Sequence, residues 1–278
     1  MQIIDFRLRP PFKSFLNTTM YGNIQRTTAS AAKKGMTVAP SARENSVELL
    51  LQEMDQSAVQ IGVVPGRTHS AFGSMDNEDL YQLTTQYPGR FVALPAIDTT
   101  NRRSAIAEIE KYQKKGCRGI VIEPGLLPNP LQIDDRKNYP IYAYCEDNDI
   151  FVLLMAGGNA GPDCTYSSPE HIDHVAADFP ELKLISGHGS WPWVTQIIHV
   201  CYRRPNIYLS PDTYLFNMPG VADYVNAANG FMAERFLFAS AYPFVSLDSA
   251  VEKFLHLGFT EENLERILFR NAARLLGL

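Results

Sequence analysis

Short runs of β-branched and aromatic residues alternate along the chain with longer amphipathic stretches. Several runs are almost continuously apolar, as parallel strands covered on both faces are. We predict eight strands, at residues 3–8, 60–64, 91–97, 119–123, 151–155, 183–187, 206–210 and 235–240. Apolar residues at helical spacing predict helices between them, for example at 46–58, 104–115, from Ser168 onward, and at 261–276. This order predicts an α/β fold, a single-domain (β/α)₈ TIM barrel spanning residues 1–278, with a doubly wound open sheet as the alternative.

Composition narrows the possible partners. The 278 residues carry 25 Lys and Arg against 30 Asp and Glu, so a net charge of -5 provides no basic surface for nucleic acid. No apolar run approaches the roughly 20 residues of a membrane helix, and the first residues do not resemble a signal peptide. Four widely spaced cysteines predict free thiols, buried as small apolar residues. We expect a cytoplasmic protein that needs no cofactor; a homo-oligomer stays open.

One segment, residues 10–42, departs from the alternation. It is rich in Thr, Ser, Asn, Gly and Lys and carries Pro10, Pro11 and Pro40. In a barrel it would follow the first strand on the face where active sites form. A loop of this length is usually a lid or a disordered segment, and we predict a lid inserted after strand 1.

Seven short motifs keep a fixed order along nearly the whole chain. They are IID at 3–5, MDQSA at 54–58, GRFVAL at 89–94, KGCRGI at 115–120, LISGHG at 184–189, FASAYP at 238–243 and NAARLL at 271–276. Together they resemble the amidohydrolase superfamily, in the branch of aminocarboxymuconate semialdehyde decarboxylase, resorcylate decarboxylases and pyrone dicarboxylate lactonase. The resemblance implies a TIM barrel and a hydrolase or lyase acting on a small carboxylated, aromatic-derived compound.

The resemblance also implies metal-ligand positions, and most of them hold other residues here. The family usually binds a divalent metal through His-x-His on strand 1, a His on strand 5 or 6 or both, and an Asp after strand 8. This chain has Arg7-Leu8-Arg9, Met155 and Ala241 at the changed positions and keeps His188. A guanidinium offers no lone pair, and a zinc site ordinarily needs three protein ligands. We therefore predict a metal-independent protein.

The two arginines give the main functional hypothesis. Side chains two apart on a strand share a face, so Asp5, Arg7 and Arg9 should point the same way. The resemblance implies that this face lies inside the barrel, at its mouth. A buried guanidinium is costly unless it meets a carboxylate, phosphate or polarised oxygen. We predict that Arg7 and Arg9, with Asp5 beside them, hold a small anionic substrate. The alternative is that both pair internally and fill the vacated cavity.

Three residues are candidates for proton transfer: His188 between two glycines, Glu123 at the end of strand 4, and Asp212 at the end of strand 7. Each has a structural alternative, as a buried imidazole or as a counter-ion of the arginines. Further pocket candidates follow other strands: Arg67, Asn159, Trp191 and Tyr242. The glycine-rich loop around Asn159 could present backbone N–H groups to an anion.

Two other functions stay open on the same barrel. One is a non-catalytic protein that binds a small molecule. The other is a metal-dependent hydrolase with a rebuilt ligand set drawn from His69, Glu123 or Asp212.

Overall fold

Parallel strands form the centre of the protein in a computed structural model that describes residues 2–68 and 70–278. Within these ranges the strands form two sheets, β1-β2-β3 and β4-β5-β6-β7. Their bounds are β1 (Ile3–Asp5), β2 (Val59–Pro65), β3 (Phe91–Leu94), β4 (Gly119–Ile122), β5 (Phe151–Met155), β6 (Leu184–Gly187) and β7 (Ile207–Ser210). Each forms inside a run predicted from the sequence or within two residues of it.

The two sheets are joined on both sides, which closes the barrel. Between β3 and β4, Ala96 forms a parallel bridge with Val121, and the N–H of Val121 donates to Pro95. Between β7 and β1, residues 236–242 run parallel to both, through the bridges Leu209–Phe236 and Leu8–Tyr242. The strands therefore close into the predicted TIM barrel.

The eighth predicted strand, 235–240, forms only isolated bridges. Phe6 donates to the carbonyl of Phe238, as a ladder would require, but the N–H of Ser240 donates to the side chain of Asp5 at 2.9 Å. The next residue, Ala241, has a positive φ of 66°. A carboxylate thus replaces a backbone partner where the chain turns, and a regular strand cannot continue.

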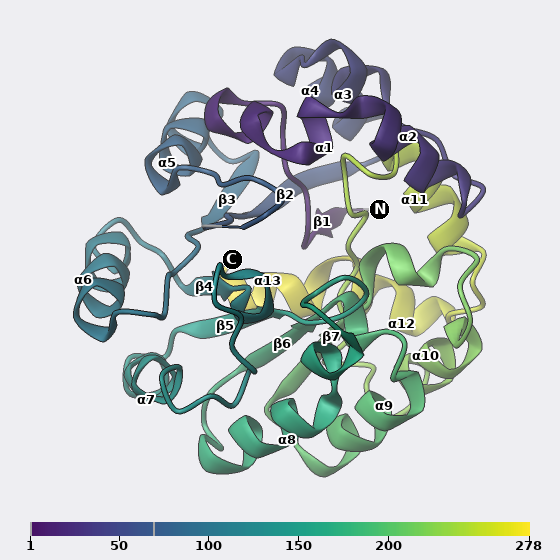
Figure 1. Ribbon diagram of the computed structural model, residues 1–278. Helices are drawn as coiled ribbons and strands as arrows, with labels where there is room; N and C mark the ends of the chain where they lie inside the picture. Colours follow the sequence, from purple (N-terminus) through teal and green to yellow (C-terminus); the bar gives the residue numbers. More distant parts are fainter. Residues whose placement is uncertain (1, 69) are drawn as a thin grey trace.

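An outer ring of helices surrounds the strands (Figure 1). It comprises α4 (Val47–Gln56), α5 (Asn77–Gln86), α6 (Arg102–Gln113), α7 (Tyr139–Asp147), α8 (Pro169–Asp178), α9 (Val194–Arg203), α10 (Val221–Ala228), α11 (Leu247–Leu255) and α12 (Glu261–Glu265). Local sequence sets their ends: Ser46 caps α4 by accepting from the N–H of Leu49, and Pro169 opens α8. None of the helices in the described ranges is long and apolar enough to cross a bilayer.

The last predicted helix, 261–276, is interrupted. After α12, residues Arg266–Arg270 form a π-helical turn, and α13 (Asn271–Leu276) follows. Figure 1 shows α13 crossing the barrel axis. Leu275 and Leu276 pack into the same apolar cluster as Phe6, and Leu276 shares a small cavity with Phe91 at the start of β3. The helix therefore closes the end of the barrel at which the strands begin.

Alternate strand residues face two apolar layers. Val121, Leu153 and Ile185 are in register on neighbouring strands and belong to the inner cluster, with α13 beneath them. Their neighbours Ile120 and Val152 belong to the outer cluster that packs under the helices. The inner layer fills the barrel up to the ends of the strands, so that only the mouth is left for a site.

Residues 10–42 form several short helices where the sequence predicted a long loop. They are η1 (Lys13–Asn17), α1 (Thr19–Gly22), α2 (Ile24–Ala32) and α3 (Pro40–Glu44). Thr19 and several residues of α2 line the cavity described below. The position fits the predicted lid, whereas opening and closing of the segment stays a prediction.

The cysteines form no disulfide, as predicted. Cys145 and Cys201 are buried and Cys117 is partly buried, but Cys164 is exposed. The prediction that all four are buried is therefore wrong for Cys164, which lies in η3 (Cys164–Ser167), a turn in the loop after β5.

Candidate active site

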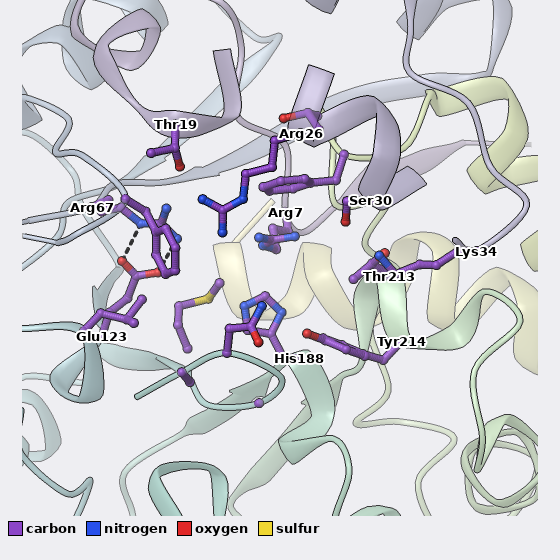
Figure 2. A pocket seen from close by; sticks show the side chains of 18 of the residues that line it. Arg7, Thr19, Arg26, Ser30, Lys34, Arg67, Glu123, His188, Thr213 and Tyr214 are labelled. Atoms are coloured by element: carbon purple, nitrogen blue, oxygen red, sulfur yellow. Dashed lines mark hydrogen bonds and ion pairs between the residues drawn. The ribbon is translucent and has the colours of Figure 1, made fainter. Parts of the chain in front are cut away.

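A cavity of about 340 Å³ opens at the barrel mouth, beneath α1 and α2 (Figure 2). The described side chains in its wall include five cations and one carboxylate: Arg7, Arg26, Lys33, Lys34, Arg67 and Glu123. Phe72, Met155, Tyr214 and Phe244 supply apolar surface. The size suits a small molecule, and the excess of positive charge suits an anion.

Arg7 lies at the centre of the cavity, just beyond β1. Arg7 is only 6% exposed, and its Nε lies 3.6 Å from Oδ2 of Asp212, the distance of a loose ion pair. Nε and Nη1 have no hydrogen-bond partner among the described residues. The guanidinium also lies 5.9 Å from the centre of the Phe244 ring. Arg7 is thus a buried cation that still has N–H donors available for a ligand.

Arg9 differs, because it does not line the cavity. Its Nε donates to the carbonyl of Pro65 at 2.9 Å and its Nη2 to that of Gly66 at 3.2 Å, and Nη2 lies 3.5 Å from Oε1 of Glu123. The prediction that Arg9 touches the substrate beside Arg7 is therefore not supported. Backbone carbonyls at the end of β2 draw this side chain into the wall of the barrel, and burial lowers its pKa well below the ordinary value.

Glu123 joins two arginines. Arg67 donates to it bidentately, from Nε to Oε2 at 2.8 Å and from Nη2 to Oε1 at 3.0 Å, and Arg9 approaches the same Oε1 (Figure 2). Burial alone would raise the pKa of Glu123, but Arg67 and Arg9 outweigh it and lower the pKa to about 2. Glu123 is therefore ionised and saturated with donors, which argues against its predicted role as a proton carrier.

His188 and Asp212 form the second polar group of the mouth. Nδ1 of His188 lies 2.7 Å from Oδ2 of Asp212, which also faces Arg7, and the other carboxylate oxygen accepts from the N–H of Thr213. His188 lines the cavity, whereas Asp212 is fully buried behind it. Burial lowers the pKa of His188 and would raise that of Asp212, but the charges of His188 and Arg7 lower the Asp212 pKa.

Both residues have backbone conformations that side chains rarely adopt, with φ of 62° at His188 and 48° at Asp212. Such strain persists only where the surroundings enforce it, and it is concentrated at functional sites. One enforcing contact is the loop after β5: a Cβ on Gly157 would lie 2.5 Å from Cβ of His188. Glycine here lets the loop backbone pack directly on the histidine.

The same loop departs from its predicted role. The N–H of Gly158 donates to the carbonyl of Trp191 at 2.7 Å and is not free for an anion. Asn159 does line the cavity, as predicted. Trp191 does not; it stacks on Tyr214 at 5.1 Å, and Tyr214 in turn packs edge-on against His188 at 5.7 Å. Trp191 therefore supports the wall without forming it.

Asp5 and Tyr242, two further predicted substrate contacts, lie away from the cavity. The carboxylate of Asp5 accepts from the N–H groups of Arg7 and Ser240 and from the Ser240 hydroxyl. Asp5 cannot share a face with Arg7, because the chain bends at Phe6 and the alternation of the strand ends there. Burial raises the pKa of Asp5. The Tyr242 hydroxyl lies 2.8 Å from that of Ser41, under α3.

The sequence predictions missed the cations that α2 contributes. Arg26 points down into the cavity and Lys34 reaches it from the side (Figure 2), and Lys33 also lines it. Arg26 and Arg67 lie 5.4 and 5.7 Å from the centre of the Phe72 ring. Burial lowers the pKa of Lys34. The signal was present: Arg26, Ser30, Lys33 and Lys34 share one face when residues 24–34 are read as a helix.

The donor set at the mouth does not fit the metal that the resemblance implies. No group of three His, Cys, Asp or Glu ligand atoms gathers there in the part of the chain that the structure describes. Glu123 is held by two arginines, and Asp212 faces His188 and Arg7. Met155 and Arg7 line the cavity where the resemblance places ligands. His69, which we considered for a rebuilt set, lies outside the described residues.

Comparisons with known proteins agree with this architecture. The chain is similar to an uncharacterised TIM-barrel protein of Bordetella bronchiseptica, with 47% identity, a TM-score of 0.97, and coverage of 100% of this chain and 99% of that chain. It shares the fold of 2,6-dihydroxybenzoate decarboxylase from Rhizobium (15% identity, TM-score 0.73, coverage 100% and 99%). It also shares the fold of a probable 2-pyrone-4,6-dicarboxylic acid hydrolase from Acinetobacter baumannii (15% identity, TM-score 0.67, coverage of 100% of both chains).

A search of curated proteins found no match. The sequence profile of the family described as Amidohydrolase matches residues 29–278, which is most of the chain and includes every strand from β2 onward. The protein therefore belongs to the amidohydrolase family.

Proposed function

We propose that this protein is a metal-independent hydrolase or lyase that acts on a small carboxylated compound. Arg7 binds an anionic oxygen of the substrate, and His188, oriented by Asp212, transfers the proton. The observation that carries the proposal is the pairing of a buried arginine with unused donors and a histidine–carboxylate contact in one cavity wall.

The anion-binding role rests on the electrostatics of Arg7. A buried guanidinium without acceptors is costly, and a substrate carboxylate would supply them. The closest carboxylate, Asp212, is 3.6 Å away and is shared with His188, so it satisfies Arg7 only in part. Lys34 and Arg26 line the same cavity and add positive charge around the bound group. Asn159, which also lines the cavity, offers an uncharged amide.

The proton-transfer role rests on the two ring nitrogens of His188. Asp212 faces Nδ1, which leaves Nε2 as the nitrogen that can serve the cavity. Because burial lowers the pKa of His188, the ring is neutral at neutral pH and can accept a proton. The imidazolium that forms would be stabilised by Asp212, whose carboxylate stays ionised because its pKa is lowered.

Hydrolysis and carbon–carbon or carbon–oxygen lysis share these two requirements. In a hydrolysis His188 would take the proton of the attacking water, and in a lysis it would move a proton to or from the substrate while Arg7 stabilises the enolate or carboxylate oxygen. Two proteins of the same fold support a carboxylated substrate: one is a decarboxylase of dihydroxybenzoate and the other a probable pyrone dicarboxylic acid hydrolase.

The test is a thermal-shift screen of small mono- and dicarboxylates, aromatic ones included, followed by turnover assays of each compound that stabilises the protein. We expect Arg7→Met to abolish the stabilisation. Arg203→Met, which removes a half-exposed arginine on α9, should leave it intact. If a carboxylate stabilised Arg7→Met as much as the wild type, the proposed role of Arg7 in binding the anion would be disproved. Binding without turnover of any ligand would favour the non-catalytic alternative.

A further inference from the structure

A second polar cluster lies outside the cavity wall. Nδ1 of His171 is 2.8 Å from Oδ1 of Asp134, and Nδ1 of His174 is 2.7 Å from Oδ2 of the same carboxylate. It is the one group in the described chain that brings three His, Cys, Asp or Glu ligand atoms within 4.8 Å of one another. One ligand atom from each side chain thus lies within 4.8 Å of the other two.

The backbone fixes each member of the cluster. His171 and His174 are three residues apart on α8, so they share one face of the helix. Asp134 lies in the loop between β4 and α7, next to Ile133. The carbonyl of Ile133 accepts from the Tyr142 hydroxyl at 2.7 Å and from the Asn138 amide at 3.1 Å. The site is therefore presented by a helix and an anchored turn.

We propose that Asp134, His171 and His174 form a binding site for a zinc-like dication. Two imidazoles and one carboxylate are a known zinc ligand set, with water in the fourth position. Nitrogen and oxygen donors of this kind select zinc and its transition-metal neighbours over calcium or magnesium. In a tetrahedral site with ligand bonds of about 2.0–2.2 Å, ligand atoms lie roughly 3.3–3.6 Å apart, so the N···O separations of 2.8 and 2.7 Å would have to widen by roughly 0.5–0.9 Å.

Solvent can reach the cluster, as a reversible site requires. The side chains of His174, His171 and Asp134 are 52%, 20% and 18% exposed. Without metal, Nδ1 of His174 and Oδ2 of Asp134 form a hydrogen bond, so a proton lies between these two ligand atoms. Binding of the dication would displace that proton and couple the site to pH.

The site would join two loops that form the mouth. Asp134 follows β4 in the loop that carries Glu123 and Leu126, and α8 follows the loop that carries Gly157 and Asn159. The same two loops are also connected by a hydrogen bond of 3.3 Å from Gln132 to Thr165. A bound dication would therefore stabilise the mouth without taking part in the chemistry. Metal found in the purified protein would not by itself indicate a catalytic metal.

The experiment is zinc binding to the full-length protein after treatment with a chelator, measured by titration calorimetry with zinc chloride. We expect one equivalent to bind and to raise the melting temperature. His171→Ala, His174→Ala and Asp134→Asn should each weaken binding by at least about tenfold, since even groups that merely support metal ligands are worth about 10–100-fold. His199→Ala, on α9, is the matched control and should bind zinc normally.

Cobalt chloride gives an independent readout. We expect visible d–d absorption of a four-coordinate cobalt ion in the wild type and its loss in the His171→Ala/His174→Ala double variant. None of these side chains is fully buried, so circular dichroism without metal should match among the variants. The site is excluded if the wild type binds no zinc, or if the double variant binds zinc as tightly as the wild type.

Discussion

The two sides of the barrel mouth treat the same kind of residue in opposite ways. On one side Arg9 and Arg67 meet Glu123 and the carbonyls of Pro65 and Gly66 in close contacts. On the other side Arg7 has one carboxylate at 3.6 Å, already shared with His188, and two nitrogens without hydrogen bonds. The two arginines of the Arg-Leu-Arg sequence therefore have different tasks. Arg9 is held by contacts within the barrel wall, whereas Arg7 faces the cavity with nitrogens that make no hydrogen bond to the described residues.

This difference separates structural from functional charge. A carboxylate held by close contacts to two arginines, such as Glu123, should contribute mainly to stability and little to chemistry. Arg7 and the His188–Asp212 contact, where hydrogen bonds are missing, should contribute more to chemistry than to stability. Single substitutions on the two sides can confirm or break the contrast.

The largest effect is expected at His188. His188→Asn removes the proton-transferring group and should lower kcat/KM on the turned-over substrate by about 10²–10⁴-fold. Asparagine tolerates the positive φ of this position better than most residues, so the fold should be retained. Steady-state kinetics and a melting curve measure both quantities. If the variant lost stability and kept its activity, His188 would be a structural residue.

The pH profile of the wild type refines this result. Because burial lowers the pKa of His188, kcat/KM should hold as the pH falls past 6.5 and should decrease only at lower pH. His199→Asn, on α9, is the control and should keep the wild-type profile. A decrease that begins well above pH 7 would contradict a neutral histidine base.

The next effect concerns stability. Glu123→Gln leaves Arg9 and Arg67 buried without a counter-charge and should cost about 3–5 kcal/mol of unfolding free energy. Arg7→Met removes a loosely paired charge and should change it by no more than about 1 kcal/mol. Urea unfolding of the two variants gives the comparison directly. Equal losses would show that both sides of the mouth are structural.

Acid should reveal the same cluster in the wild type. The pKa of Glu123 is lowered from 4.5 to about 2, so the unfolded state takes up the proton first as the pH falls. Its stabilising contribution, about 3 kcal/mol, is complete above pH 4.5 and is lost progressively towards pH 2. The stability difference between the wild type and Glu123→Gln should shrink over that range. A difference that stays constant would mean that Glu123 is not ionised in the folded state.

The fold followed from the sequence because a barrel repeats one local pattern. The strands were found from apolar runs, and β5 was located to the residue. The sequence predicts a regular strand 8, but its ladder is broken by a long-range contact, Ser240 to Asp5, which no local pattern records. The π turn at Arg266–Arg270 also has no local signature in the sequence.

The site was predictable only in part. Five predicted residues do line the cavity, and their positions on or after predicted strands were enough to find them: Arg7, His188, Glu123, Arg67 and Asn159. The alternation of side chains failed for Asp5, because the chain bends at Phe6. The alternation also could not separate Arg7 from Arg9. Arg9 is drawn aside by two carbonyls at the end of β2, Pro65 and Gly66, which are distant in sequence. The cations of α2 were missed because residues 10–42 were read as a loop.

The smallest effect tests those cations. Arg26 is exposed on α2 and points into the cavity, with no carboxylate within 4 Å among the described residues. Arg26→Gln should weaken anion binding by only a few-fold at low salt, since an exposed charge contributes about 0.2–1 kcal/mol, and the effect should vanish near 1 M salt. Arg7→Met should weaken binding at every ionic strength, because a buried charge is screened much less. Arg102→Gln, at the start of α6, controls for net charge. If Arg26→Gln were as costly as Arg7→Met and insensitive to salt, α2 would close over the ligand and bury Arg26, and residues 10–42 would act as a moving lid.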